Sequence, residues 1–135
     1  MSSNSATLRW LAVVPSAGIV YVGVAFIGFA LLATAQTFCP PKDVVSGNCA
    51  APWWRHVELA IVCFSAALAA FLMVVAPALV APSQRVLVSR GVFVFGAVIA
   101  VGGIIAGAYL EGASAIVCGL LGLYIINSRY GKHDA

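Results

Sequence analysis

Residues 38–58 read FCPPKDVVSGNCAAPWWRHVE and form the long polar interruption of a chain that is otherwise almost continuously apolar. The segment holds two of the 4 cysteines, two of the 3 tryptophans and three of the 6 prolines. One long apolar run precedes it and three follow it. This segment therefore divides the chain and predicts how the apolar runs are connected.

The composition is that of an integral membrane protein. Of the 135 residues, 63% are hydrophobic and 8% are charged, whereas soluble domains are about 25% charged. A helix needs about 20 apolar residues to cross the hydrocarbon core, so the chain has room for four crossings. The net charge of +3 comes from scattered single basic residues and does not indicate a nucleic-acid partner.

These patterns predict an all-α, polytopic membrane protein, a small four-helix transmembrane bundle with a disulfide-closed outer loop between its first two helices. The whole chain, 1–135, is expected to be one transmembrane domain. A tight reversal is predicted at Glu111-Gly112, because glycine tolerates the backbone angles of a sharp turn. The expected helices cover residues 11–35, 57–80, 91–110 and 113–127, with the outer loop at 36–56 and a cytoplasmic loop at 81–90.

The first apolar run is too long for the 7–15-residue core of a secretory signal. It is therefore expected to stay as a transmembrane helix. Ala33-Thr34-Ala35 does resemble a signal-peptidase site, so cleavage of this segment remains the alternative.

Basic residues predict the sidedness. An alternating topology puts five of them on one side and only Lys42 and Arg55 on the other. Since short cytoplasmic loops are enriched in Lys and Arg, both termini are predicted to be cytoplasmic, in a bacterial inner membrane. The five residues on the cytoplasmic side are Arg9, Arg85, Arg90, Arg129 and Lys132.

The cysteines favour a structural role. Cys39 and Cys49 bracket Pro-Pro and Ser-Gly bends, and a disulfide between them would remove about 3 kcal/mol of unfolded-state entropy. Cys63 and Cys118 are expected at similar depths in two helices, and the sequence leaves open whether they pair. No two cysteines have the C-x-x-C spacing of a thiol-exchange motif, which argues against a redox enzyme.

Chemistry-bearing residues are sparse. No Asp, Glu, Lys, Arg or His falls near the middle of a predicted helix, and ion-coupled carriers use such groups. His56, Glu58 and Glu111 are expected near the outer interface, but their spacing is not that of a metal site. Arg55 and Glu58, three apart, predict a surface ion pair. No catalytic residue, metal or cofactor is predicted.

Glycines and aromatic residues suggest contact surfaces. Small residues let helix backbones approach closely in membranes, and four glycines are predicted to pack helices: Gly96, Gly103, Gly107 and Gly119. Gly103 and Gly107 match the G-x-x-x-G pattern. Trp53, Trp54 and Arg55 are the candidate contact with a partner.

The function expected from these features is that of a non-catalytic accessory or scaffold subunit of a larger membrane complex. Its partners are expected to be the lipid bilayer and another membrane protein, or a second copy of the chain. The alternative is a homo-oligomeric small-solute transporter or pore. A membrane thiol-redox protein is the third hypothesis.

Overall fold

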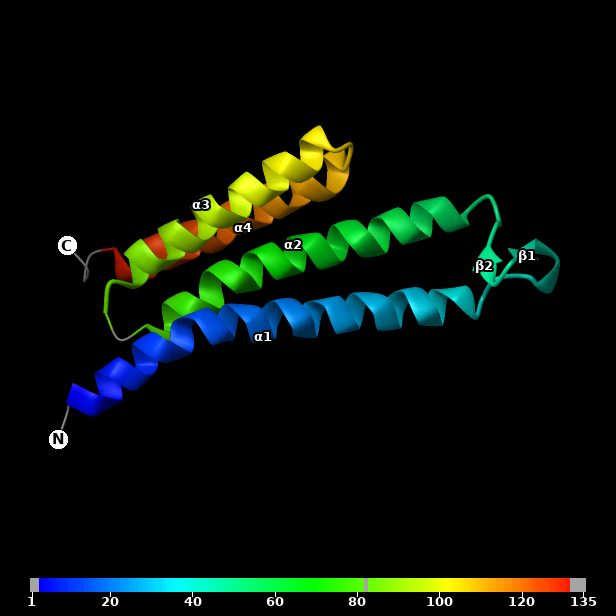
Figure 1. Cartoon of the computed structure of the whole chain (residues 1–135). Helices are drawn as coiled ribbons and strands as arrows, with labels where there is room; N and C mark the ends of the chain where they lie inside the picture. Colours follow the sequence, from blue (N-terminus) through cyan, green and yellow to red (C-terminus); the bar gives the residue numbers. More distant parts are fainter. Residues whose placement is uncertain (1–2, 82, 132–135) are drawn as a thin grey trace.

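The computed structural model describes residues 3–81 and 83–131. Lys132 and the side chain of Arg9, both used to predict sidedness, lie outside this part of the molecule. Within it, four helices are long and apolar enough to cross a membrane, which confirms the predicted all-α architecture. They are α1 (Ser3–Gln36), α2 (Trp54–Val80), α3 (Arg85–Ile105) and α4 (Tyr109–Tyr130) (Figure 1).

The helices form an open bundle around α2. Figure 1 shows α1 alongside α2, and α3 and α4 as a hairpin on the other side of α2. α2 packs against each of the other helices, whereas α1 and α3 have almost no close backbone contact in the described structure. The N-terminus, the C-terminus and the α2–α3 connection lie at one end, the terminal end. The opposite end, with the α1–α2 connection, is the disulfide end.

α1 packs through a narrow stripe. At Val24 the exposed fraction is 4%, and a Cβ added to the buried Gly28 would lie 2.7 Å from Ser65 Oγ. The rest of its surface is open, and Phe26 and Phe29 are 72% and 71% exposed. With 34 residues, α1 is about 50 Å long, longer than a hydrocarbon core of about 30 Å. α1 begins at Ser3, well before the predicted residue 11.

The α1–α2 connection is a small hairpin closed by a disulfide. A 3-10 turn, η1 (Pro41–Asp43), leads into the antiparallel strands β1 (Val44–Val45) and β2 (Asn48–Cys49). Ser46 and Gly47 connect the strands with φ of 50° and 82°, as a two-residue type I′ turn requires. The Cys39–Cys49 disulfide, with a Cα–Cα distance of 5.9 Å, ties the base of the hairpin to the end of α1, as predicted.

The α2–α3 connection is shorter than predicted, because α3 begins at Arg85 and not at residue 91. The first turns of α3 are helical since they bury Val86 and Ser89 on one face, with Val86 against Ala78 and Ile126 in the core at the terminal end. The basic residues that indicated a loop project from this helix instead. Arg85 lies over the Tyr130 ring at 4.6 Å from its centroid.

The α3–α4 turn lies at residues 106–108, so the predicted reversal at Glu111-Gly112 is wrong. Gly107 has φ of 103°. Its N–H bonds to the carbonyl of Ile104, and the Ala108 N–H bonds to the carbonyl of Gly103. This is a Schellman motif, which ends a helix at a left-handed glycine. Gly107 is therefore a helix terminator, and not the second member of a G-x-x-x-G pair on a helix face.

Glycines of α4 also make close helix contacts. A Cβ added to Gly112 would overlap Ile104 and lie 2.9 Å from the carbonyl oxygen of Ala100. At Gly119 an added Cβ would lie 3.1 Å from the ring of Phe93. Because these positions carry no side chain, α4 can approach α3 closely there.

Candidate functional site

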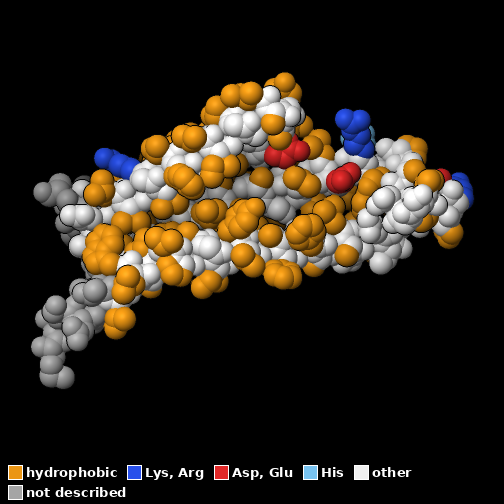
Figure 2. Space-filling view, viewed as in Figure 1, with side chains coloured by type: hydrophobic (Ala, Val, Ile, Leu, Met, Phe, Trp, Pro, Cys, Tyr) orange, Lys and Arg blue, Asp and Glu red, His pale blue; other side chains and the backbone are white. Residues whose placement is uncertain are grey.

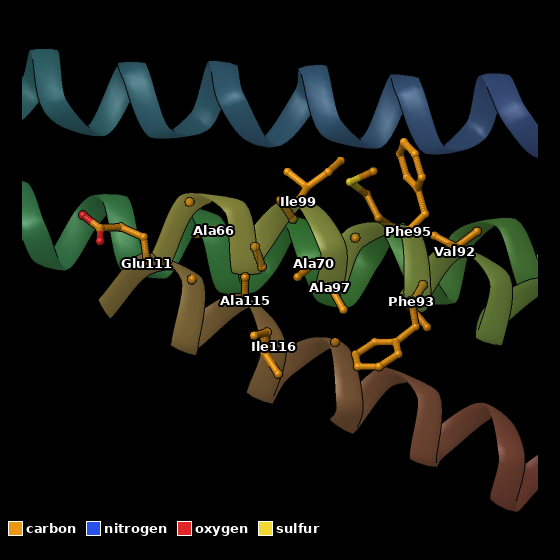
Figure 3. A pocket seen from close by; sticks show the side chains of 18 of the residues that line it. Ala66, Ala70, Val92, Phe93, Phe95, Ala97, Ile99, Glu111, Ala115 and Ile116 are labelled. Atoms are coloured by element: carbon orange, nitrogen blue, oxygen red, sulfur yellow. The ribbon is translucent and has the colours of Figure 1, made fainter. Parts of the chain in front are cut away.

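An apolar groove of about 330 Å³ lies between α2, α3 and α4 (Figure 3). This volume is in the range of about 300–1,000 Å³ that is typical of ligand pockets. Along α3 it extends from Val92 to Gly103, about 17 Å or three helical turns. Tyr21 of α1 lies at its margin. The groove is therefore a long slot along the bundle and not a closed cavity.

The groove exists because small residues face each other across it. α2 contributes Ala66, Ala69 and Ala70, and α3 contributes Gly96 and Gly103. Because helix residues seven apart share a face, both glycines present bare backbone to the slot. Apart from the adjacent backbone of α3 itself, no atom of the described chain lies within 4 Å of a Cβ built on either glycine.

Side chains at the two edges of α3 differ in direction. Phe95 and Ile99 point toward α1, whereas Phe93 lies on the α4 side (Figure 3). Phe95 and Ile99 are 67% and 61% exposed. They leave the space between α1 and α3 open to the surroundings. Among the described residues, no helix packs on Gly96 or Gly103, which were predicted to pack helices.

A second cavity, of about 390 Å³, lies at the disulfide end and is lined by charged as well as apolar residues. The first turns of α2 and α4 build it, with Tyr109 and Leu110 beside three charged residues. We call it the polar mouth, and its charged residues are Arg55, Glu58 and Glu111. On the face drawn in Figure 2, acidic and basic side chains gather near the tip of the α3–α4 hairpin, while hydrophobic side chains cover the middle of the helices.

Glu111 joins the two cavities. It lines both the apolar groove and the polar mouth, and it is half-buried in the first turn of α4. Ser114, one turn further along, donates from its hydroxyl to the carbonyls of Cys63 and Glu111 at 3.2 and 2.9 Å. The bond to Cys63 places Ser114 level with that residue of α2. Glu111, one turn earlier in α4, therefore lies level with about the second turn of α2.

The charged residues of the polar mouth form no ion pair within the described part of the chain. The predicted ion pair between Arg55 and Glu58 does not form, although both residues line this cavity. Neither Glu58 nor Glu111 makes an ion pair with any residue in 3–81 or 83–131. The spacing of three residues explains why both side chains line the same cavity. An ion pair between two exposed side chains would add little to the stability of the helix.

The predicted aromatic contact lies beside this mouth. Trp53 precedes α2 and Trp54 begins it, and their rings meet edge to face with centroids 6.0 Å apart. Trp53 is exposed and Trp54 half-buried. The disulfide-tied hairpin connects to them through the buried Ala51. The two tryptophans and Arg55 thus occupy the disulfide end, where the sequence placed them, and their role in binding a partner stays a prediction.

The remaining cysteines are free. Cys63 lies in α2 and Cys118 in α4, and both are half-buried. Because Ser114 is level with Cys63, and α2 and α4 both run from the disulfide end, Cys118 lies about 6 Å deeper along the bundle. In the described residues, no group of three or more His, Cys, Asp or Glu could hold a metal ion.

The sequence missed the role of Glu111 as the junction of groove and mouth. Its nearest signal was the combination of one carboxylate with Gly112, which was interpreted as a turn. No protein-family model, curated protein or solved structure matches this chain, so its function is argued from this geometry alone.

Proposed function

We propose that the chain is a non-catalytic accessory subunit of a larger membrane complex, and that it binds one transmembrane helix of its partner in the apolar groove. The observation that supports this most is the bare backbone of Gly96 and Gly103, where no described atom outside the adjacent backbone of α3 lies within 4 Å of an added Cβ. Helices in membranes associate through such small-residue faces, because dispersion contacts grow as backbones approach.

The open bundle supports a helix as the occupant. The slot is about three turns long, its floor is made of alanines, and it opens between α1 and α3. An acyl chain could lie there as well, but flexible lipid chains do not require bare glycine backbone on the wall. A helix does require it in order to sit at an interaxial distance near the lower end of the usual 8–10 Å.

The same proposal places the disulfide hairpin and Trp53-Trp54 on the outer side of a bacterial inner membrane. Arg85, Arg90 and Arg129 lie at the terminal end, and this excess of basic residues favours a cytoplasmic location for that end and for both termini. Reporter fusions at the C-terminus would test the orientation. Activity of a periplasm-dependent reporter there would refute it.

A matched pair of substitutions tests the docking. Gly103 lines the groove and its neighbour Gly102 does not, and both have free space for a side chain within the described chain. A tagged chain is isolated from its native membrane in mild detergent, and the complex is weighed by native mass spectrometry. The wild type and Gly102→Leu should carry a larger membrane protein in fixed stoichiometry, and Gly103→Leu should lose it.

Two results would refute the accessory role. One is a homo-oligomer with no other subunit, which would favour the transporter or pore instead. The other is equal retention of the partner by Gly102→Leu and Gly103→Leu, which would place the contact outside the groove.

A further inference from the structure

We propose that the helix bound in the groove comes from a different protein and carries a lysine or arginine near its outer end, which pairs with Glu111. This inference rests on the proposed function and specifies the chemistry of the partner. Among the described residues, Glu111 is the one charged residue that lines the apolar groove.

The first step is the charge of the site. The polar mouth has two carboxylates and one guanidinium, an excess of one negative charge. Glu111 stands in the first turn of α4. No ion pair within residues 3–81 and 83–131 supplies a cation to Glu111.

The second step is what docking does to this carboxylate. A helix lying in the groove covers the groove side of Glu111 and removes water from it. Burying an unpaired charge is costly, and a cation from the incoming helix offsets that cost. A wholly neutral helix would therefore bury the Glu111 carboxylate without a partner. A helix with a basic residue at this depth would bury it as one member of an ion pair.

The third step identifies the source of the cation. Exposed apolar side chains lie on α1, α3 and α4, and none of these helices has a basic residue in its turn at the disulfide end. Arg55 lies in the first turn of α2, the helix that packs against each of the other three. A second copy would thus bring no basic helix end to Glu111, which points to a different protein.

The fourth step is the register. Glu111 lies level with the second turn of α2, close to the membrane interface. A lysine or arginine at that depth keeps its stem in the apolar layer and its charged group at the boundary. Facing the alanine floor, the partner helix needs small or medium apolar side chains over about three turns.

The experiment uses the full chain in its native membrane. A photo-reactive benzoylphenylalanine replaces Tyr21, which lies at the margin of the groove and is 58% exposed. The same group at Phe26, exposed on α1 and outside the groove, is the control position. Irradiation at Tyr21 and not at Phe26 should give one protein adduct, whose cross-linked peptide is then sequenced.

Glu111→Gln then tests the charge, with Glu58→Gln as its matched control. Glu58 lines the polar mouth but not the groove. Losing one member of a desolvated charge pair should lower the adduct yield about tenfold or more, whereas Glu58→Gln should change it less than about threefold. In the Glu111→Lys variant, changing the partner's basic residue to Glu should restore the adduct.

Each outcome has a consequence. A cross-linked transmembrane peptide with no basic residue within one turn of its outer end, or an adduct that is insensitive to Glu111→Gln, would refute this inference and leave the accessory role standing. An adduct with lipid alone, or with a second copy of the chain, would refute both. A basic transmembrane peptide whose cross-linking depends on Glu111 would support both.

Discussion

Replacing Gly112 by alanine tests whether α3 and α4 depend on direct backbone contact next to their turn. The new methyl group would overlap the side chain of Ile104 and lie 2.9 Å from the carbonyl oxygen of Ala100. Ile104 has rotamers through which it can move aside, but the carbonyl belongs to the backbone of α3. The hairpin therefore has to open by a few tenths of an ångström for the methyl group to fit.

The expected magnitude combines two opposing effects. Overpacking of this kind costs about 1–3 kcal/mol. Exchanging glycine for alanine stabilises a helix by up to about 1 kcal/mol, because alanine has the higher helix propensity. The control is Gly102→Ala in α3, because no described atom lies within 4 Å of its added Cβ. The difference between the two variants isolates the steric effect and should be about 1–3 kcal/mol.

The assay is reversible unfolding in mixed micelles, followed by tryptophan fluorescence at increasing fractions of a denaturing detergent. Gly112→Ala should unfold at a lower fraction than the wild type, and Gly102→Ala at an equal or higher fraction. If Gly112→Ala were as stable as Gly102→Ala, α3 and α4 would not meet at this glycine and the reasoning would be wrong.

Three further predictions concern the connections and the terminal end. Changing both Cys39 and Cys49 to serine should speed protease cleavage of the hairpin by up to about a hundredfold, because the disulfide contributes about 3 kcal/mol to its closure, while the helices keep their stability; unchanged cleavage would refute this. Gly107→Ala should destabilise the α3–α4 hairpin by about 1–2 kcal/mol in the micelle assay, since its φ of 103° disfavours a side chain, and a neutral effect would contradict the Schellman turn. Arg85→Met should cost about 0.5–1 kcal/mol by removing the contact with Tyr130, and this loss should disappear in a Tyr130→Leu background.

Hydropathy and length were sufficient to predict the four helices, because a membrane-spanning helix must satisfy every backbone hydrogen bond internally and needs a long apolar stretch. The Cys39–Cys49 disulfide followed from spacing and the bends between the two residues. Helix ends were less predictable. Arg85 and Arg90 were interpreted as loop residues, although a helix can present such side chains at its surface while it buries Val86 and Ser89.

The positions of the glycines were evident from the sequence, but their roles were not. The sequence indicated which residues are small, but a glycine in a helix has three different uses that depend on its neighbours in space. Gly107 terminates α3, Gly112 admits the backbone of α3, and Gly103 faces an open groove. All three occur in similar apolar surroundings in the sequence, so pattern alone could not separate them.

The sequence by itself determined that this chain has four membrane-length helices, with a disulfide-closed loop between the first two and two short connections elsewhere, because those properties depend on local composition and spacing. Only the tertiary structure decided that α1 and α3 stay apart and that Glu111 lies where an apolar groove meets a polar mouth. Such features depend on which helix faces meet. Residues as distant in sequence as Tyr21, Ala70 and Glu111 come together only when α2 has packed against the other three helices.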